Sequence, residues 1–428
     1  MYLSKRNDSE IWVKSLVGLF LALSLMMILS HYVRINTSVI LWLSGLIGLL
    51  SVVVNLTIFK KYTCKKNTVA FGCIITLFQF IPVLLYQVHI FDDIKSIGLN
   101  ITLLTIPLHF IFWATAESSY VTISDEDINR VIFGIFVISS IMTIIIFALE
   151  FRSIPRILSN RTNAYASAWN GFFPNKNMLG SFSALGLVAG IETLFFSEDK
   201  KKVILLNIPI AIALVFSLCR DALLFLGVFL LVFLLRRFDR KKQLSSSQKK
   251  GKNIFLITLI ILVIAAIIAI MMSPSIRSFI HDKVLRLDIG DASRGTIQQN
   301  IINSINEKGV SAWLLGVGYS ELNYISSHDC HSIYLYSYAT GGIIKLLFLA
   351  IVLIFAIRNI HKCRNEFLKD YSYGILFAYL VFGFFETNQM FEVGLVNYEF
   401  FLFIFLLPAL SLKRNDMSLQ GGYHEKRK

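Results

Sequence analysis

The sequence predicts an all-α integral membrane protein with about 12 transmembrane helices, and three observations lead to this fold class. The chain of 428 residues is 55% hydrophobic but only 16% charged, and its mean hydropathy is +0.66. Soluble domains carry nearer a quarter charged residues. The apolar residues gather in runs of the roughly 20 residues that a helix needs to span a bilayer. This pattern excludes a cytosolic enzyme and a disordered scaffold. The five scattered cysteines exclude a disulfide-stapled secreted module.

Unbroken apolar runs, each bounded by charges, proline or polar clusters, mark the expected spans in chain order. The first run lacks a small-residue cleavage site, so we expect a retained span rather than a signal peptide. Residues 1–273 then hold helices 1–9, with a shorter loop at 150–176. Residues 274–331 form a long loop, and 332–428 hold helices 10–12 and a tail. The twelve spans are 11–30, 37–58, 68–88, 97–116, 131–149, 177–196, 203–219, 221–235, 253–273, 332–357, 371–387 and 394–412.

The basic residues predict the orientation. With the N-terminus inside, 27 of the 41 Lys and Arg residues fall on the cytoplasmic side and 12 on the other, while Lys14 and Lys345 fall inside spans. Cytoplasmic loops carry such an excess, so both termini are expected in the cytoplasm. The same bias explains the net charge of +14, and no nucleic-acid partner is expected.

The long loop 274–331 shows a helical pattern of its own. Ile297, Ile301, Ile302 and Ile305 recur at helical spacing after a candidate N-cap at Ser293. Such a loop favours amphipathic helices that lie on the membrane and cover a cavity. The alternative is a peripheral segment with no role.

Arginines on the outer side are candidate ligands, because outer loops normally avoid positive charge. Arg220 lies in a hairpin directly between two apolar runs, and Arg294 opens the expected loop helix. Guanidinium groups bind phosphate in a bidentate manner, which suits a diphosphate on a lipid carrier. The alternatives are a salt bridge to Asp221 or snorkelling for Arg220, and a solvated first-turn residue for Arg294. Three weaker candidates lie partly on one helical face: Arg152, Arg156 and Arg161.

His331 is the candidate general base at the mouth of the tenth span. The ordinary pKa of histidine suits proton removal near neutral pH. A structural, hydrogen-bonded histidine is the main alternative. His328, Asp329 and Cys330 could join His331 as metal ligands, but catalytic zinc sites usually draw ligands from more than one segment, so no metal is expected.

Two cysteines directly precede the candidate residues Arg220 and His331. If those two residues share one site, Cys219 and Cys330 could be close enough to form a disulfide. Buried free cysteine is the alternative.

Four motifs follow one another from about residue 150 to the end of the chain. Residues 171–180 are similar to the Gly-Phe…Lys-Asn-x-Leu-Gly element that opens the sixth span in one superfamily, and 218–222 are similar to its Ser-Arg-Gly/Ala element. Arg294 with 315–318 resembles an Arg…Gly-x-Gly stretch, and 331–342 resembles a His-Asn-x-x-Leu…Gly element. The chain thus resembles the superfamily of O-antigen polymerases (Wzy) and O-antigen ligases (WaaL). That superfamily also includes related exopolysaccharide polymerases.

The chain departs from the superfamily pattern at three positions. Cys219 stands where Ser is usual, Asp221 where Gly or Ala is usual, and Ser332 where Asn is usual. The carboxylate of Asp221 could partly neutralise the adjacent Arg220. Glu386 matches an acidic position that many polymerases carry before the last span.

The resemblance implies a GT-C-like glycosyltransferase in the bacterial inner membrane, with its active site at the periplasmic face. The donor would be a glycan on undecaprenyl diphosphate, and the reaction would invert the anomeric centre without a metal or cofactor. His331 would deprotonate the acceptor, while Arg220 and Arg294 would hold the diphosphate. The implied substrate-binding residues are Arg152, Arg156, Arg161, Lys176, Asn177 and Glu386.

Three functions remain open on this basis. A polymerase passes the chain to a new lipid-linked repeat, and a ligase passes it to lipid A–core. The Lys176-Asn177 element and Glu386 favour the polymerase. The implied partners are the lipid-linked donor, either acceptor, membrane lipids and a candidate chain-length regulator.

A flippase or other transporter is the alternative from a different class. Transporters tend to carry charges and broken helices at the midplane. Here the central ionisable residues are Glu192, Lys345 and Glu399, each expected to reach a membrane face by snorkelling.

Overall fold

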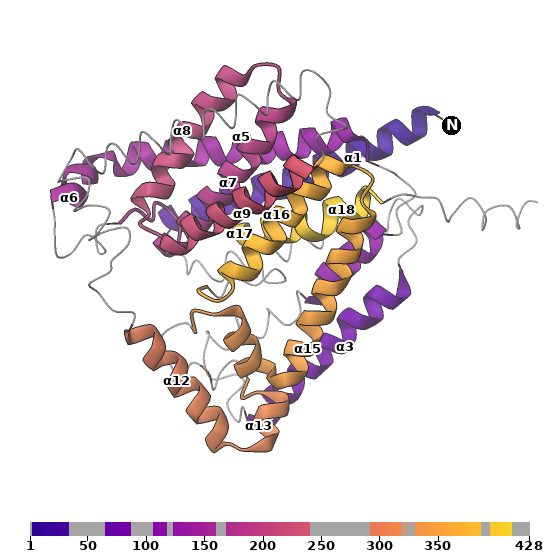
Figure 1. The fold of residues 1–428 in the computed structure, drawn as a ribbon, viewed down its shortest axis with the longest axis vertical. Helices are drawn as coiled ribbons and strands as arrows, with labels where there is room; N and C mark the ends of the chain where they lie inside the picture. Colours follow the sequence, from indigo (N-terminus) through magenta and orange to yellow (C-terminus); the bar gives the residue numbers. More distant parts are fainter. Residues whose placement is uncertain are drawn as a thin grey trace, which may run out of the picture.

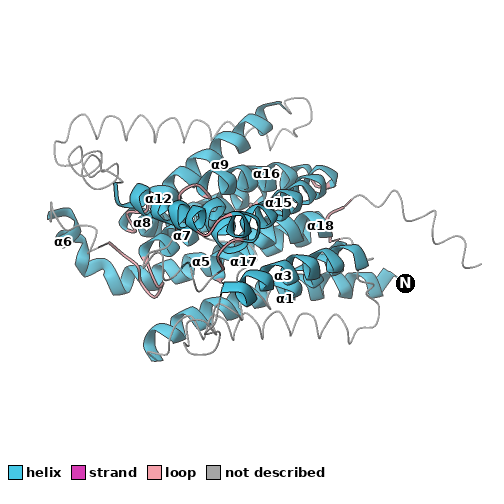
Figure 2. Ribbon diagram, turned by 90° about the horizontal axis from the view of Figure 1, so that it is seen from below, coloured by secondary structure: helices cyan, strands magenta, loops and turns pink. Residues whose placement is uncertain are grey.

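The structure is a computed structural model, and it describes residues 2–33, 65–86, 106–117, 123–159, 168–239, 292–318, 322, 330–386 and 394–412. The regular elements within these ranges are helices, as Figure 2 shows. One isolated bridge joins Cys363 and Leu412. The expected all-α fold class is confirmed for this part of the chain.

The helix bounds follow the apolar runs closely. Residues 106–117 are also helical. The helices are α1 (Tyr2–Val33), α3 (Lys66–Tyr86), α5 (Asp125–Glu150), α6 (Ile154–Ser159), α7 (Lys176–Phe196), α8 (Lys200–Phe216), α9 (Arg220–Asp239), α12 (Ala292–Glu307), α13 (Val310–Leu315), α15 (Ile333–Lys362), α16 (Glu366–Phe382), α17 (Leu395–Phe401) and α18 (Leu407–Leu410), with a 3-10 turn at Phe151–Ser153 and a π-helical turn at Leu402–Leu406.

Among the described residues, four helices are long and apolar enough to cross a membrane. They are Ser9–Tyr32, Asp125–Leu158, Lys176–Phe196 and Ile333–Lys362, and Lys66–Phe78 and Leu395–Leu410 are shorter apolar helices. The expected spans 37–58 and 253–273 lie outside the described residues, so the total of twelve spans stays a prediction.

Large apolar side chains also cover the outside of the bundle. On α15, the exposed side chains include those of Ile343, Leu347, Ile351 and Ile354, which recur along one face. Soluble proteins rarely expose apolar patches of this extent. Lipid is the solvent that suits this face, and the chain is therefore a helical membrane protein.

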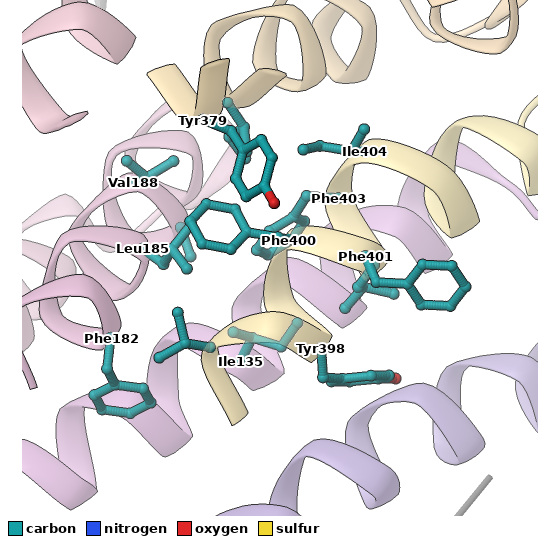
Figure 3. Close-up of a cluster of buried hydrophobic side chains, with 14 of the residues drawn as sticks. Ile135, Phe182, Leu185, Val188, Tyr379, Tyr398, Phe400, Phe401, Phe403 and Ile404 are labelled. Carbon is teal, nitrogen blue, oxygen red and sulfur yellow. The ribbon is translucent and has the colours of Figure 1, made fainter. Parts of the chain in front are cut away.

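The core lies where α5, α7, α9, α16 and α17 pack together. Figure 1 shows α7, α9, α16 and α17 across the middle of the molecule, with α15 and α3 to one side. Phe400 is buried in this core, and its ring contacts those of Phe225 and Phe382. Figure 3 shows Phe400 beside Tyr379, whose ring it also contacts. Each such aromatic side chain buries a large apolar area, which holds the helices in one arrangement.

The helix ends meet at two opposite ends of the bundle. The start of α7, the α8–α9 turn, the start of α15 and the end of α16 meet at what we call the Asn177 end. The end of α7, the end of α9 and the start of α16 meet at what we call the Arg237 end, where Arg237 pairs with Glu192 and Arg236 with Asp370.

The expected loop helix is present as α12. Ile301 and Ile305 are buried while Ile302 is exposed, so the helix is amphipathic as predicted. The helix begins at Ala292, which places Ser293 inside its first turn, and the prediction that Ser293 is the N-cap is wrong. Figure 1 shows α12 and α13 apart from the central helices, beside α15.

A break in α15 holds α13 in place. Gly342 has φ 64° inside α15, and Val317 N donates a hydrogen bond to Ala339 O at 2.7 Å. A Cβ added at Gly342 would overlap the backbone of Leu314. Only glycine combines this backbone angle with so close an approach.

We therefore expect Gly342→Ala to lower the free energy of unfolding by about 1–3 kcal/mol, through strain and overlap. Denaturant unfolding in detergent measures the change. Gly295→Ala is the matched control, because a Cβ at Gly295 on α12 meets open space. Equal stability of the two variants would contradict the role assigned to Gly342.

Candidate functional site

The site is built around one hydrogen bond at the Asn177 end. Asn177 Nδ2 donates to Glu386 Oε1 at 2.6 Å, and this bond joins the first turn of α7 to the residues that follow α16. Asn175 caps α7 by accepting from Met178 N at 2.9 Å, which fixes where the helix begins and thus where Asn177 lies. Glu386 is only 6% exposed, so its bond to the amide is largely shielded from water.

The turn that carries Arg220 packs against the same part of α7. Cys219 Sγ lies 4.0 Å from Asn177 O, and a Cβ on Gly180 would overlap the Cys219 side chain. The glycine that ends the Lys-Asn-x-Leu-Gly element therefore has a physical reason, since it admits the α8–α9 turn. Arg220 follows as the first residue of α9 and is half-buried.

His331 is held at the start of α15, close to the end of α16. Its backbone has φ 51°, in the left-handed region, and Ser332 follows as the N-cap of α15. Ile333 N donates to Gly383 O at 2.8 Å, and the Tyr334 hydroxyl donates to Leu380 O at 2.6 Å. Both bonds attach the start of α15 to α16, three to six residues before Glu386. Ser332 Oγ accepts from Leu335 N at 3.4 Å, a capping role that asparagine would also suit.

These contacts connect four predicted site residues, Asn177, Arg220, His331 and Glu386, from four distant parts of the chain. Arg220 is linked to Asn177 through the α8–α9 turn, and His331 is linked to Glu386 through α16. Lys176, beside Asn177, is buried. A half-buried imidazole and a half-buried guanidinium at one end of a membrane bundle are suited to accept a proton and to stabilise an anion.

The residues between α5 and α7 that the structure describes reach the same end of the bundle. Trp169 Nε1 donates to Ser153 Oγ at 2.7 Å, and Trp169 N donates to Phe216 O at 2.9 Å, next to the α8–α9 turn. Arg152 and Arg156 are exposed on this segment. Arg161 lies outside the described residues. Arg294 lies in the first turn of α12, which packs against α13 and α15.

The two cysteines at the site are free thiols. Cys219 and Cys330 are both buried and unbridged, so the hypothesis of a disulfide between them is wrong and the alternative, buried free cysteine, is what the structure has. The Cys219 side chain packs against α7, and Cys330 belongs to a separate apolar cluster with Ala339 and Ile305.

The described residues contain no group of three or more His, Cys, Asp or Glu side chains that could hold a metal ion. His328 and Asp329 lie outside the described residues. The residues gathered at the Asn177 end are donors and a carboxylate suited to a polar or anionic substrate.

The sequence interpretation failed for the ionisable residues inside the spans. Glu192, Lys345 and Glu399 are 3%, 7% and 0% exposed, so the prediction that they reach a membrane face by snorkelling is wrong. Glu192 pairs with Arg237, and Lys345 Nζ lies 2.8 Å from Thr340 Oγ1. Position within an apolar run reveals depth in the membrane but does not reveal which neighbours a side chain meets.

No protein-family model matches the chain, and no curated protein matches it significantly. The fold and composition define the class, a helical membrane protein. Any narrower assignment rests on the four motifs and on how the chain arranges them.

Proposed function

We propose that the chain is a membrane glycosyltransferase that moves a glycan from undecaprenyl diphosphate to a sugar hydroxyl, and that it acts as a repeat-unit polymerase of a surface polysaccharide. One observation carries the proposal. The hydrogen bond from Asn177 to Glu386 spans 209 residues of sequence and joins two motif elements that favour the polymerase. The Arg220 turn and the start of α15 are held at this bond by the contacts described above.

In the proposed mechanism, His331 removes the proton from the acceptor hydroxyl as its oxygen attacks the anomeric carbon of the donor. The bond from that carbon to the diphosphate oxygen breaks at the same time, with inversion. Arg220 and Arg294 neutralise the charge that develops on the leaving diphosphate. The proton is then released from the imidazole to the outer side. The excess of basic residues at the opposite, Arg237 end supports the proposal that the Asn177 end faces the periplasm.

Polymerase activity is tested with the purified chain in liposomes and a synthetic undecaprenyl-diphosphate-linked repeat unit. We expect the repeat units to join into a ladder of lipid-linked products in a buffer with a metal chelator. A known polymerase with its own donor is run alongside as the positive control. If that control makes a ladder and the donor given to this chain stays at one repeat, the proposal is contradicted.

Deletion of the gene separates the polymerase from the ligase. Electrophoresis of lipopolysaccharide is expected to show core that carries one repeat if the chain is a polymerase. Core without repeats, together with accumulated lipid-linked polymer, would instead identify a ligase.

A transporter of lipid-linked oligosaccharides is the second candidate, and one observation favours it. Glu399 and Lys345 are buried within the membrane-spanning part of the chain, where ionisable residues often mark a transport path. A transporter would move a fluorescently labelled lipid-linked repeat across a liposome membrane and leave the repeat at its original length. The ladder assay detects whether the length changes.

A further inference from the structure

The Asn177–Glu386 pair offers an inference that rests on the proposed function and deepens it. The resemblance assigns both residues to substrate binding, yet the structure points their side chains at each other. The Oε1–Nδ2 distance of 2.6 Å is short for a bond between an amide and a carboxylate. One oxygen of the carboxylate and one hydrogen of the amide are thus already engaged within the protein.

Each partner of the pair is attached to a different candidate catalytic residue. On one side, Cys219 packs against the backbone of Asn177 and against Gly180, one helical turn further along α7. Cys219 directly precedes Arg220. On the other side, Glu386 N donates to Phe382 O at 3.1 Å, and the neighbouring Gly383 O accepts from Ile333 N, two residues after His331. The pair therefore links the turn that carries Arg220 to the end of α16, which holds the start of α15 and with it His331.

We propose that Asn177 and Glu386 are positioning residues, which set the separation of Arg220 and His331 and do not themselves touch the substrate. Transfer requires both groups in register with one sugar, and a misplacement of about 1 Å can reduce a rate about 10²-fold. The pair would therefore act on the rate of the chemical step and leave donor binding nearly unchanged.

The test uses the ladder assay with variants that keep or remove the bond. Glu386→Gln keeps an acceptor oxygen, so we expect its kcat to stay within about fivefold of the wild type. Glu386→Ala removes the bond, and Asn177→Asp places two carboxylates together, so each is expected to lower kcat by about 10²-fold with KM for the donor unchanged. The double variant Asn177→Asp with Glu386→Gln restores a bond in the reverse direction and is expected to recover most of the rate.

The chain supplies a matched control at the other end of the bundle. Asn359 Nδ2 donates to Glu117 Oε1 at 2.9 Å, a bond of the same type far from the site. Asn359→Ala is expected to leave kcat within about twofold of the wild type. Thermal unfolding in detergent shows whether each variant is folded, and the double variant keeps the test decisive if a single variant is not.

Each result has a distinct meaning. Loss of activity in Glu386→Gln with a changed pH profile would overturn the proposal, because Glu386 would then exchange a proton in the reaction. A rise in KM for the donor with kcat unchanged would also overturn it, in favour of direct binding. Failure of the wild-type chain to make a ladder would instead contradict the proposed function itself.

Discussion

Replacement of His331 by asparagine is expected to reduce glycan transfer by about 10²–10⁴-fold, because a general base contributes rate enhancements of that size. Asparagine is the suitable substitute since His331 has φ 51°, and asparagine tolerates the left-handed region better than most residues. The lower rate of transfer can then be attributed to the missing base and not to a strained backbone. The initial rate of ladder formation measures the effect.

The amount of His331→Asn protein in the membrane and its thermal unfolding are expected to match the wild type. Arg220→Ala is expected to give a comparable loss, because the leaving diphosphate would lack its guanidinium. Ladders of normal length and rate from both variants would refute the mechanism assigned to the Asn177 end.

Removal of Arg237 is expected to produce the largest loss of stability, about 3–5 kcal/mol in the free energy of unfolding for Arg237→Ala. The guanidinium of Arg237 is 3.3 Å from Glu192 Oε2, and both side chains are almost fully buried. It also lies 4.1 Å from the ring centroid of Phe367 and 4.6 Å from that of Phe195. Its loss would leave the Glu192 carboxylate buried without its cationic partner, which is the costly outcome for a buried ion pair.

Unfolding by denaturant in detergent micelles measures this change. The double variant Arg237→Met with Glu192→Gln removes both charges together and is expected to recover most of the lost stability. Lys14→Ala is the control, because its ion pair with Glu10 is exposed and should contribute about 0–1 kcal/mol. A loss for Arg237→Ala no greater than for Lys14→Ala would show that the buried pair contributes nothing.

The helices were predictable because a long apolar run in a membrane protein has few alternatives to a helix. The predicted spans 131–149 and 177–196 lie within α5 and α7, and the span 332–357 coincides with α15 from the N-cap Ser332 onward. The period of the isoleucines likewise predicted α12. Local pattern is sufficient for elements of this kind.

The contacts between helices were not predictable in the same way. Asn177 and Glu386 were both identified as site residues, but no local pattern shows that they bind each other across 209 residues. The hypothesis of a Cys219–Cys330 disulfide was wrong for the same reason, since proximity of two motifs does not determine where their side chains pack. The sequence identifies the groups, and only the packing decides their partners.

The buried carboxyl group on α17 has a consequence for insertion into the membrane. Glu399 lies on α17 with no exposed surface, and neither carboxyl oxygen has a hydrogen-bond partner among the described residues. A carboxyl group facing lipid is costly, so this helix is poorly suited to wait alone in the bilayer. The adjacent Tyr398 hydroxyl donates to Leu16 O on α1 at 3.2 Å. Packing of α17 against α1 therefore does more than add apolar contact, because it gives this helix a protein surface on which the carboxyl group is kept out of lipid.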